Sequence, residues 1–278
     1  MPGNAANPRL DPLFPPYCAQ KTEGRDFFFY LQIRLRKRFD TPPYSLTGGG
    51  ASPMPDIDSN IRLPLSFGNA GAPTLTLFRA LAHEQPREPL ERFVQQQFRK
   101  AHNADVRQFM PELFGLQDGS GALCAVAGIR HASAGTLFLE NYLDAPIEQQ
   151  VNAAAGRLIE RQCIVEVGNL AASSLGSARL SIITVTWLLA MGGFEWVAFT
   201  GNAALVNSFN RLGLNPVTLC TADPARLGEE RHTWGSYYDS RPSVHVGDIR
   251  AGFLHLSSMG IFERFGLPQT LEPDCHVA

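Results

Sequence analysis

The chain has 278 residues, and its 44% hydrophobic content is enough to bury one sizeable core. A formal net charge of −2, from 24 basic and 26 acidic residues, excludes attraction to nucleic acid through the charge of the whole protein. The 5 cysteines and 7 histidines lack the spacing of a metal site, so we predict no bound metal. The N-terminus lacks the charged start and apolar segment of a secretory signal, and we expect a cytoplasmic protein.

Residues 1–72 are rich in Pro, Gly, Asn and Ser and show little periodicity, which predicts an irregular and partly disordered arm. One segment of it, RDFFFYLQIRLRKRFD at 25–40, combines aromatic with basic side chains. Two interpretations stay open for this segment. It is either a short element packed on the domain or a contact with a membrane surface or an acidic partner, because basic and aromatic residues together suit an anionic interface.

Regular patterns begin at residue 73. Alternating apolar residues predict strands, and helical spacing of apolar residues predicts helices. The expected strands cover 73–81, two runs within 111–132 joined by an Asp-Gly turn, 163–171, 194–201 and 215–220; the expected helices cover 89–104, about 146–157, a stretch ending at 191, and 203–213. This mixture predicts one α+β domain over residues 73–222, with a mixed central sheet flanked by helices.

The C-terminal residues 223–278 contain turn formers between short apolar pieces. Their WGSYYD run, at 234–239, would be costly to leave in water. We therefore expect a C-terminal extension that packs on the same domain.

Residues 180–194 contain no ionisable side chain. The run ends at Arg179 and Glu195, short of the roughly 20 apolar residues that cross a bilayer. Apolar side chains occupy every face of the expected helix, which is typical of a helix covered by protein.

A small-residue loop, SSLGSA at 173–178, precedes this helix. Backbone N–H groups that converge at a helix N-terminus can form a phosphate seat, and here they would come from Ser173, Ser174, Gly176, Ser177 and Ala178. The alternative is a serine-capped helix with a permissive glycine.

The strand at 163–171 carries Glu166 among apolar residues. Strict alternation would put Glu166 and Asn169 on opposite faces, but Gly168 between them could permit a bulge that turns both into one cleft. A buried carboxylate needs a reason, which is either a salt bridge with Arg130 or service as a base that accepts the proton of an attacking amine. Glu140 is either a second carboxylate at the cleft mouth or a capping or solvated residue.

The order of elements resembles the N-acetyltransferase (GNAT) superfamily, whose phosphate loop reads Arg/Gln-x-x-Gly-x-Gly/Ala. Gly176 and Ala178 match that loop, and Ser173 stands where Arg or Gln is usual. The segment NAALVNSFNRLGL at 202–214 is similar to the superfamily's Asn-bearing helix, with Asn207 on the helix and Phe209 in place of the usual tyrosine. The resemblance implies a GNAT-like sheet.

A second resemblance, over roughly 75–253, is to the thermostable hemolysin family. It is carried by RHASAGTLFLENYLDAPIE at 130–148, IVEVGNLAAS at 164–173, GGFEWVAFT at 192–200, NSFNRLGL at 207–214 and WGSYY at 234–238. Members look like relatives of acyl-homoserine-lactone synthases, which take acyl chains from acyl-carrier protein. Those enzymes have an Arg on one strand and Glu-x-x-Arg on the next; Arg130 and Glu166 match the first two positions, and Asn169 replaces the last.

These resemblances imply an acyltransferase that moves an acyl group from a pantetheine thioester to the amine of a small metabolite. The donor is acyl-carrier protein, a candidate partner, or acyl-CoA, and no cofactor stays bound. Ser173 favours the carrier protein, because its single phosphodiester asks less of the loop than the pyrophosphate of CoA. Two other classes stay open: a membrane-active haemolysin-type protein, and a GNAT-like binding module without turnover.

Overall fold

The computed structural model describes residues 55–69, 74–83 and 87–268. The aromatic and basic segment at 25–40, Cys18 and Cys275 lie outside the described residues.

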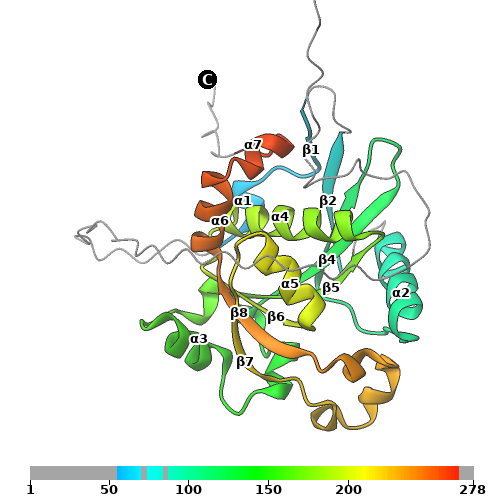
Figure 1. Ribbon diagram of the computed structural model, residues 1–278, viewed down its shortest axis with the longest axis vertical. Coiled ribbons are helices and arrows are strands. Elements are labelled where there is room, and N and C mark those ends of the chain that lie inside the picture. The colour runs from blue at the N-terminus through cyan, green and yellow to red at the C-terminus, as the bar shows by residue number, and fades with distance from the viewer. Residues whose placement is uncertain (1–54, 70–73, 84–86, 269–278) are drawn as a thin grey trace, which may run out of the picture. The chain divides into compact units, whose positions relative to one another are not determined.

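Eight strands of the described residues form one mixed sheet in the order β1-β2-β3-β4-β5-β6-β8-β7 (Figure 1). Their bounds are β1 Leu65–Phe67, β2 Leu75–Leu81, β3 Glu112–Gln117, β4 Leu123–His131, β5 Ile164–Ala172, β6 Trp196–Gly201, β7 Val217–Thr221 and β8 Ser243–Asp248. Neighbouring strands are antiparallel except β5 and β6, which run parallel. The structure thus confirms the expected α+β fold with a mixed central sheet.

Helices cover both faces of this sheet. The α-helices are α1 Ile57–Asn60, α2 Glu88–His102, α3 Ile147–Ala155, α4 Leu175–Met191, α5 Ala203–Arg211, α6 Ile249–Ser258 and α7 Ile261–Phe265. The 3₁₀ helices are η1 Ala132–Ala134, η2 Phe138–Tyr142, η3 Arg161–Cys163, η4 Pro224–Trp234 and η5 Tyr237–Ser240. On one face, α2 packs Leu90 and Val94 against Leu113 and Val126 of the sheet.

Helix α4 follows β5 and returns the chain to the parallel strand β6, running across the sheet in Figure 1. Leu180, Ile183 and Trp187 are each at most 1% exposed, so the prediction of a helix covered by protein is confirmed. Within the described parts of the chain, no helix combines the length and apolar character needed to cross a bilayer.

Two segments outside the expected domain belong to its sheet. Strand β1, within the expected arm, pairs with β2, and its Phe67 is only 4% exposed. Strand β8, within the expected extension, lies between β6 and β7. The structure therefore differs from the expected boundaries at residues 72 and 222. Short strands such as the three-residue β1 carry almost no periodic signal, and their place depends on partners far away in sequence.

Met110 packs against two glycines that face each other across β4 and β5. A Cβ atom on Gly128 would lie 2.7 Å from Met110 Cβ, whereas one on Gly168 would lie 2.3 Å from the terminal Cε of the same side chain. The Cε end can rotate away, but Cβ moves only with the backbone. Both glycines therefore leave room for Met110, and Gly128 is the less replaceable of the two.

We predict that Gly128→Ala lowers the free energy of unfolding by about 1–3 kcal/mol, as overpacked cores do, and that Gly168→Ala lowers it by less. Urea unfolding of the purified variants measures both. Gly247→Ala on β8 is the matched control, since its added Cβ would meet Val197 Cγ1 at an ordinary 3.5 Å. Equal losses for the two substitutions beside Met110 would contradict this account.

Candidate active site

The parallel strands β5 and β6 separate partway along their length. Their pairing ends at Val167 opposite Phe199, after which β5 continues beside β4 and β6 continues beside β8. The register between β4 and β5 shifts between Val126 and Gly128, so β5 contains a bulge at this point. The bulge that the sequence suggested near Gly168 is present, and it opens a gap in the sheet.

Asn169 holds the bulge in place. Its backbone has φ of 48°, in the left-handed region that Asn tolerates better than most residues. Its Oδ1 accepts a hydrogen bond from the N–H of Met110 at 2.7 Å, and its Nδ2 donates to the carbonyl of Gln108 at 3.3 Å. Asn169 lines the gap, but its amide is engaged with the backbone of the neighbouring segment.

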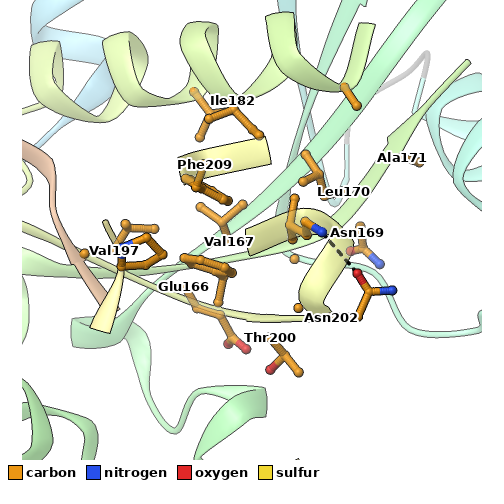
Figure 2. A pocket seen from close by; sticks show the side chains of 18 of the residues that line it. Glu166, Val167, Asn169, Leu170, Ala171, Ile182, Val197, Thr200, Asn202 and Phe209 are labelled. Atoms are coloured by element: carbon orange, nitrogen blue, oxygen red, sulfur yellow. Dashed lines mark hydrogen bonds between the residues drawn. The ribbon is translucent and has the colours of Figure 1, made fainter. Parts of the chain in front are cut away.

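A cavity of about 750 Å³ occupies the gap and reaches both faces of the sheet (Figure 2). Glu166 pairs with Ala198, so Glu166 and Thr200 share one face, which is also the face of η2. Val167 and Phe199 point to the other face, where Phe199 stacks on Phe209 of α5 with ring centroids 4.8 Å apart. One cavity therefore connects the Glu166 side of the sheet with the α4–α5 side.

Glu166 is 3% exposed and lines the cavity. Its Oε2 accepts the N–H of Phe138 at 2.8 Å, and its Oε1 accepts the N–H of Leu139 at 2.9 Å. Burial raises the pKa of this carboxyl to about 7, although the two N–H donors and the positive charge of Arg130 oppose the shift. A carboxylate with such a pKa can both take up and release a proton near neutral pH.

Arg130 lies opposite Glu166 in the register of β4 and β5. The described residues show no salt bridge between the two side chains within 4 Å, so the salt-bridge alternative is not observed. The guanidinium instead donates to the carbonyl of Thr136 at 3.4 Å and lines the cavity. Backbone N–H groups of η2 satisfy the carboxylate, and this leaves the arginine available to a ligand.

Glu140 lies outside the lining of the cavity, where hydrogen bonds and an ion pair hold its carboxylate. It accepts the N–H groups of Leu137 and Ile147 at 2.7 and 2.8 Å and pairs with Arg161 at 2.7 Å. These bonds outweigh burial and lower the pKa of Glu140 to about 2. The geometry matches the capping interpretation of Glu140, and the alternative position at the cleft mouth is not observed.

The loop at 173–178 caps α4. Ser174 is the N-cap, and its Oγ accepts the N–H of Ser177 at 3.1 Å. The N–H groups of Leu175 and Gly176, in the first turn, have no acceptor within the helix. Ser174 and Ala178 line the cavity, whereas Ser173, Gly176 and Ser177 are outside the lining. The loop is thus a serine cap whose first turn borders the cavity.

The asparagine of the α5 segment that reaches the cavity is Asn202, not the expected Asn207. Asn202 caps α5 by accepting the N–H of Leu205 at 3.1 Å. Phe209 lines the cavity from the same helix, and Figure 2 labels both Asn202 and Phe209.

Several lining residues were missed by reasoning from the sequence. One is Thr200, whose Oγ1 is buried without a hydrogen-bond partner among the described residues. The others are six aromatic residues from three separate segments: Phe98, Phe138, Tyr142, Trp234, Tyr237 and Tyr238. The cost of exposing WGSYYD was a usable signal for part of this group. The sequence did not indicate which surface these rings would cover.

Residues 80–253 match the family model described as thermostable hemolysin, and the chain belongs to that family. Similar solved structures include FeeM, an N-acyl amino acid synthase from uncultured soil microbes, with 13% identity over 69% of this chain and 100% of that one and a TM-score of 0.48. The acyl-homoserine-lactone synthase LasI has 11% identity over 63% and 90% of the two chains and a TM-score of 0.44. The CoA-dependent acyl-homoserine-lactone synthase MesI has 10% identity over 71% and 99% and a TM-score of 0.40. No curated protein matches the sequence.

The raised pKa of Glu166 predicts a pH-dependent stability. The pKa of about 7 in the folded state exceeds the value of about 4.3 for a free glutamate, so the folded protein binds an extra proton between these values. The stability cost of ionised Glu166 therefore grows as pH rises through this window and is constant above it. We expect Glu166→Gln to raise the melting temperature, relative to wild type, more at pH 8 than at pH 4.5. Thermal unfolding at both pH values checks this, and a difference independent of pH would contradict it.

Proposed function

We propose that the protein is an acyltransferase that moves an acyl group from a pantetheine thioester to the amine of a small metabolite. The observation that carries the proposal is the buried Glu166, placed at the gap between two separating parallel strands and inside a cavity open to both faces of the sheet. Glu166 lines the cavity, where a ligand can contact it. This position favours an enzyme over a binding module whose carboxylate is shielded from ligands.

The α4–α5 side of the cavity suits the donor. Ile182, Val197 and Phe209 offer it an apolar lining for a pantetheine arm and acyl chain. The first turn of α4 borders the same cavity, and its N–H groups and helix dipole favour a phosphate. In this scheme the phosphate binds at the α4 N-terminus and the thioester reaches the gap between β5 and β6.

The acceptor approaches from the Glu166 side. The amine arrives as an ammonium ion and gives one proton to the Glu166 carboxylate. The neutral nitrogen attacks the thioester carbon, the C–N bond forms, and the C–S bond breaks. The second proton of the nitrogen ends on the departing sulfur, so that the products are an amide and a free thiol. The unpartnered Thr200 hydroxyl, on the same face, is the donor we assign to the developing oxyanion.

Arg130 binds a carboxylate of the acceptor in this scheme, because its guanidinium lines the cavity without an acidic partner within 4 Å among the described residues. Asn169 acts as a positioning residue, since its amide keeps β5 apart from β6. Ser173, in place of Arg or Gln, favours acyl-carrier protein over CoA as donor. Its hydroxyl is close to another side chain of the loop, with Oγ 3.3 Å from the Oγ of Ser177.

Thiol release from acyl-CoA and acyl-carrier-protein thioesters, supplied with pooled amines, tests the function together with product mass. We expect transfer with at least one donor, and Glu166→Gln should lower kcat/KM by about 10²–10⁴ because it removes the base. Glu112→Gln is the matched control: Glu112 lies on β3, pairs with Arg79 at 3.3 Å and is outside the cavity lining. Full activity of Glu166→Gln would remove Glu166 from the mechanism, and absence of transfer from every donor would reject the proposed function.

The proposed base also predicts a pH profile. Because the ionised form of Glu166 accepts the proton and its pKa is about 7, kcat/KM should fall about tenfold per pH unit below that value. Initial rates between pH 5 and 9 with saturating donor measure this profile. A rate that stays constant from pH 8 down to pH 5 would exclude a base with this pKa.

A further inference from the structure

Six aromatic rings form a continuous wall on the Glu166 side of the cavity, and all six line it: Phe98, Phe138, Tyr142, Trp234, Tyr237 and Tyr238. Trp234 is the centre of the wall, with ring centroids 6.2 Å from Phe98, 5.9 Å from Phe138 and 5.5 Å from Tyr237. The wall continues from Phe138 to Tyr142 at 6.1 Å. Because α2, η2 and the segment containing η4 and η5 each contribute, this aromatic wall exists only in the folded chain.

The aromatic wall adjoins the proposed base directly. The N–H of Phe138 donates to Glu166, so the backbone that carries one ring also holds the carboxylate. Within the same wall, Tyr237 donates a hydrogen bond from Oη to the carbonyl of Thr200 at 3.5 Å. A molecule whose amine meets Glu166 therefore places its remaining atoms against these rings.

The aromatic wall is uncharged. The hydroxyls of Tyr142 and Tyr238 hydrogen-bond to each other. Burial raises the pKa of Tyr238 to about 12, and it also raises the pKa values of Tyr142 and Tyr237. His102 also lines the cavity, and burial lowers its pKa, which favours the neutral ring. Flat, neutral surfaces of this kind bind aromatic groups by offset stacking and edge-to-face contact.

Two opposite charges lie beside the wall. Arg130 and Glu166 are cross-strand neighbours on one face of β4 and β5, so their side chains start only about 5 Å apart. They are not joined by a salt bridge within 4 Å, and both line the cavity. An α-amino acid carries its ammonium and carboxylate groups on a single carbon, and this neighbouring pair complements both groups at once.

We propose that this side of the cavity is a subsite for α-amino acids with aromatic side chains, which are the acceptors of the transferase reaction. The ammonium group meets Glu166, the carboxylate pairs with Arg130, and the side-chain ring packs on Trp234 and Phe98. This inference rests on the proposed function for its chemistry, whereas binding of the amino acid rests on the subsite alone.

Calorimetric titration of the full-length protein with phenylalanine, tryptophan, leucine and phenethylamine tests the subsite without any thioester. We expect the aromatic amino acids to bind at least about tenfold more tightly than leucine, which has no ring, and than phenethylamine, which has no carboxylate. Equal affinity for phenylalanine and leucine would overturn the aromatic assignment. Equal affinity for phenylalanine and phenethylamine would overturn the role of Arg130.

Two substitutions at one position separate ring loss from misfolding. Trp234→Leu should weaken phenylalanine binding about tenfold and leave leucine binding unchanged, whereas Trp234→Phe keeps a ring and should retain most of the affinity. Two outcomes would count against the subsite. In one, Trp234→Leu weakens the binding of phenylalanine and of leucine equally; in the other, Trp234→Leu and Trp234→Phe weaken phenylalanine binding equally. In the transfer assay the same preference should appear in the KM of the amino acid, with the KM of the thioester unchanged.

The two proposals fail in distinguishable ways. Selective binding of aromatic amino acids without transfer from any thioester supports the subsite and rejects the acyltransferase. Transfer to amines that shows no preference for aromatic amino acids supports the acyltransferase and rejects the subsite.

Discussion

The separation of β5 from β6 beyond Val167 and Phe199 is the constraint on which the site depends. If the two strands stayed paired, they would satisfy each other's backbone N–H and C=O groups and close this gap. Another interaction must therefore hold the strands apart. The amide of Asn169 provides it, because it bonds the backbone at Gln108 and Met110 and fixes a left-handed turn within β5. The bulge is therefore a built feature of the strand, and the cavity is its direct consequence.

The protonation of Glu166 reflects a balance between burial and hydrogen bonding. Burial disfavours the charge, and the two N–H donors of η2 restore part of the stability that water would supply. Glu140 lies in η2, the element whose N–H groups bond Glu166, but its own partners include Arg161, and its pKa is lowered to about 2. The pKa values of the two carboxyls differ because only Glu140 has a positively charged partner in direct contact.

The cavity has two chemically different sides because the gap passes through the sheet. The α4–α5 side is apolar and ends near a helix N-terminus, whereas the Glu166 side combines rings with two opposite charges. A group-transfer enzyme has to bring two unlike molecules together at one point, and a sheet opened between two strands separates their binding sites while joining their reactive ends. The architecture is consistent with a donor and an acceptor that enter from different faces.

The sequence alone determined the features that depend on neighbours along the chain. Apolar side chains on every face identified α4 as a buried helix, an Asp-Gly turn between two strand patterns identified the hairpin of β3 and β4, and a charge within an apolar strand singled out Glu166. The resemblance to known families also placed Arg130 beside it. Only the tertiary structure decided that Glu166 bonds to the backbone of η2, that β1 and β8 join the sheet, and that rings from three segments form one wall. These contacts join residues far apart in sequence, and their free energy depends on a geometry that local patterns do not encode.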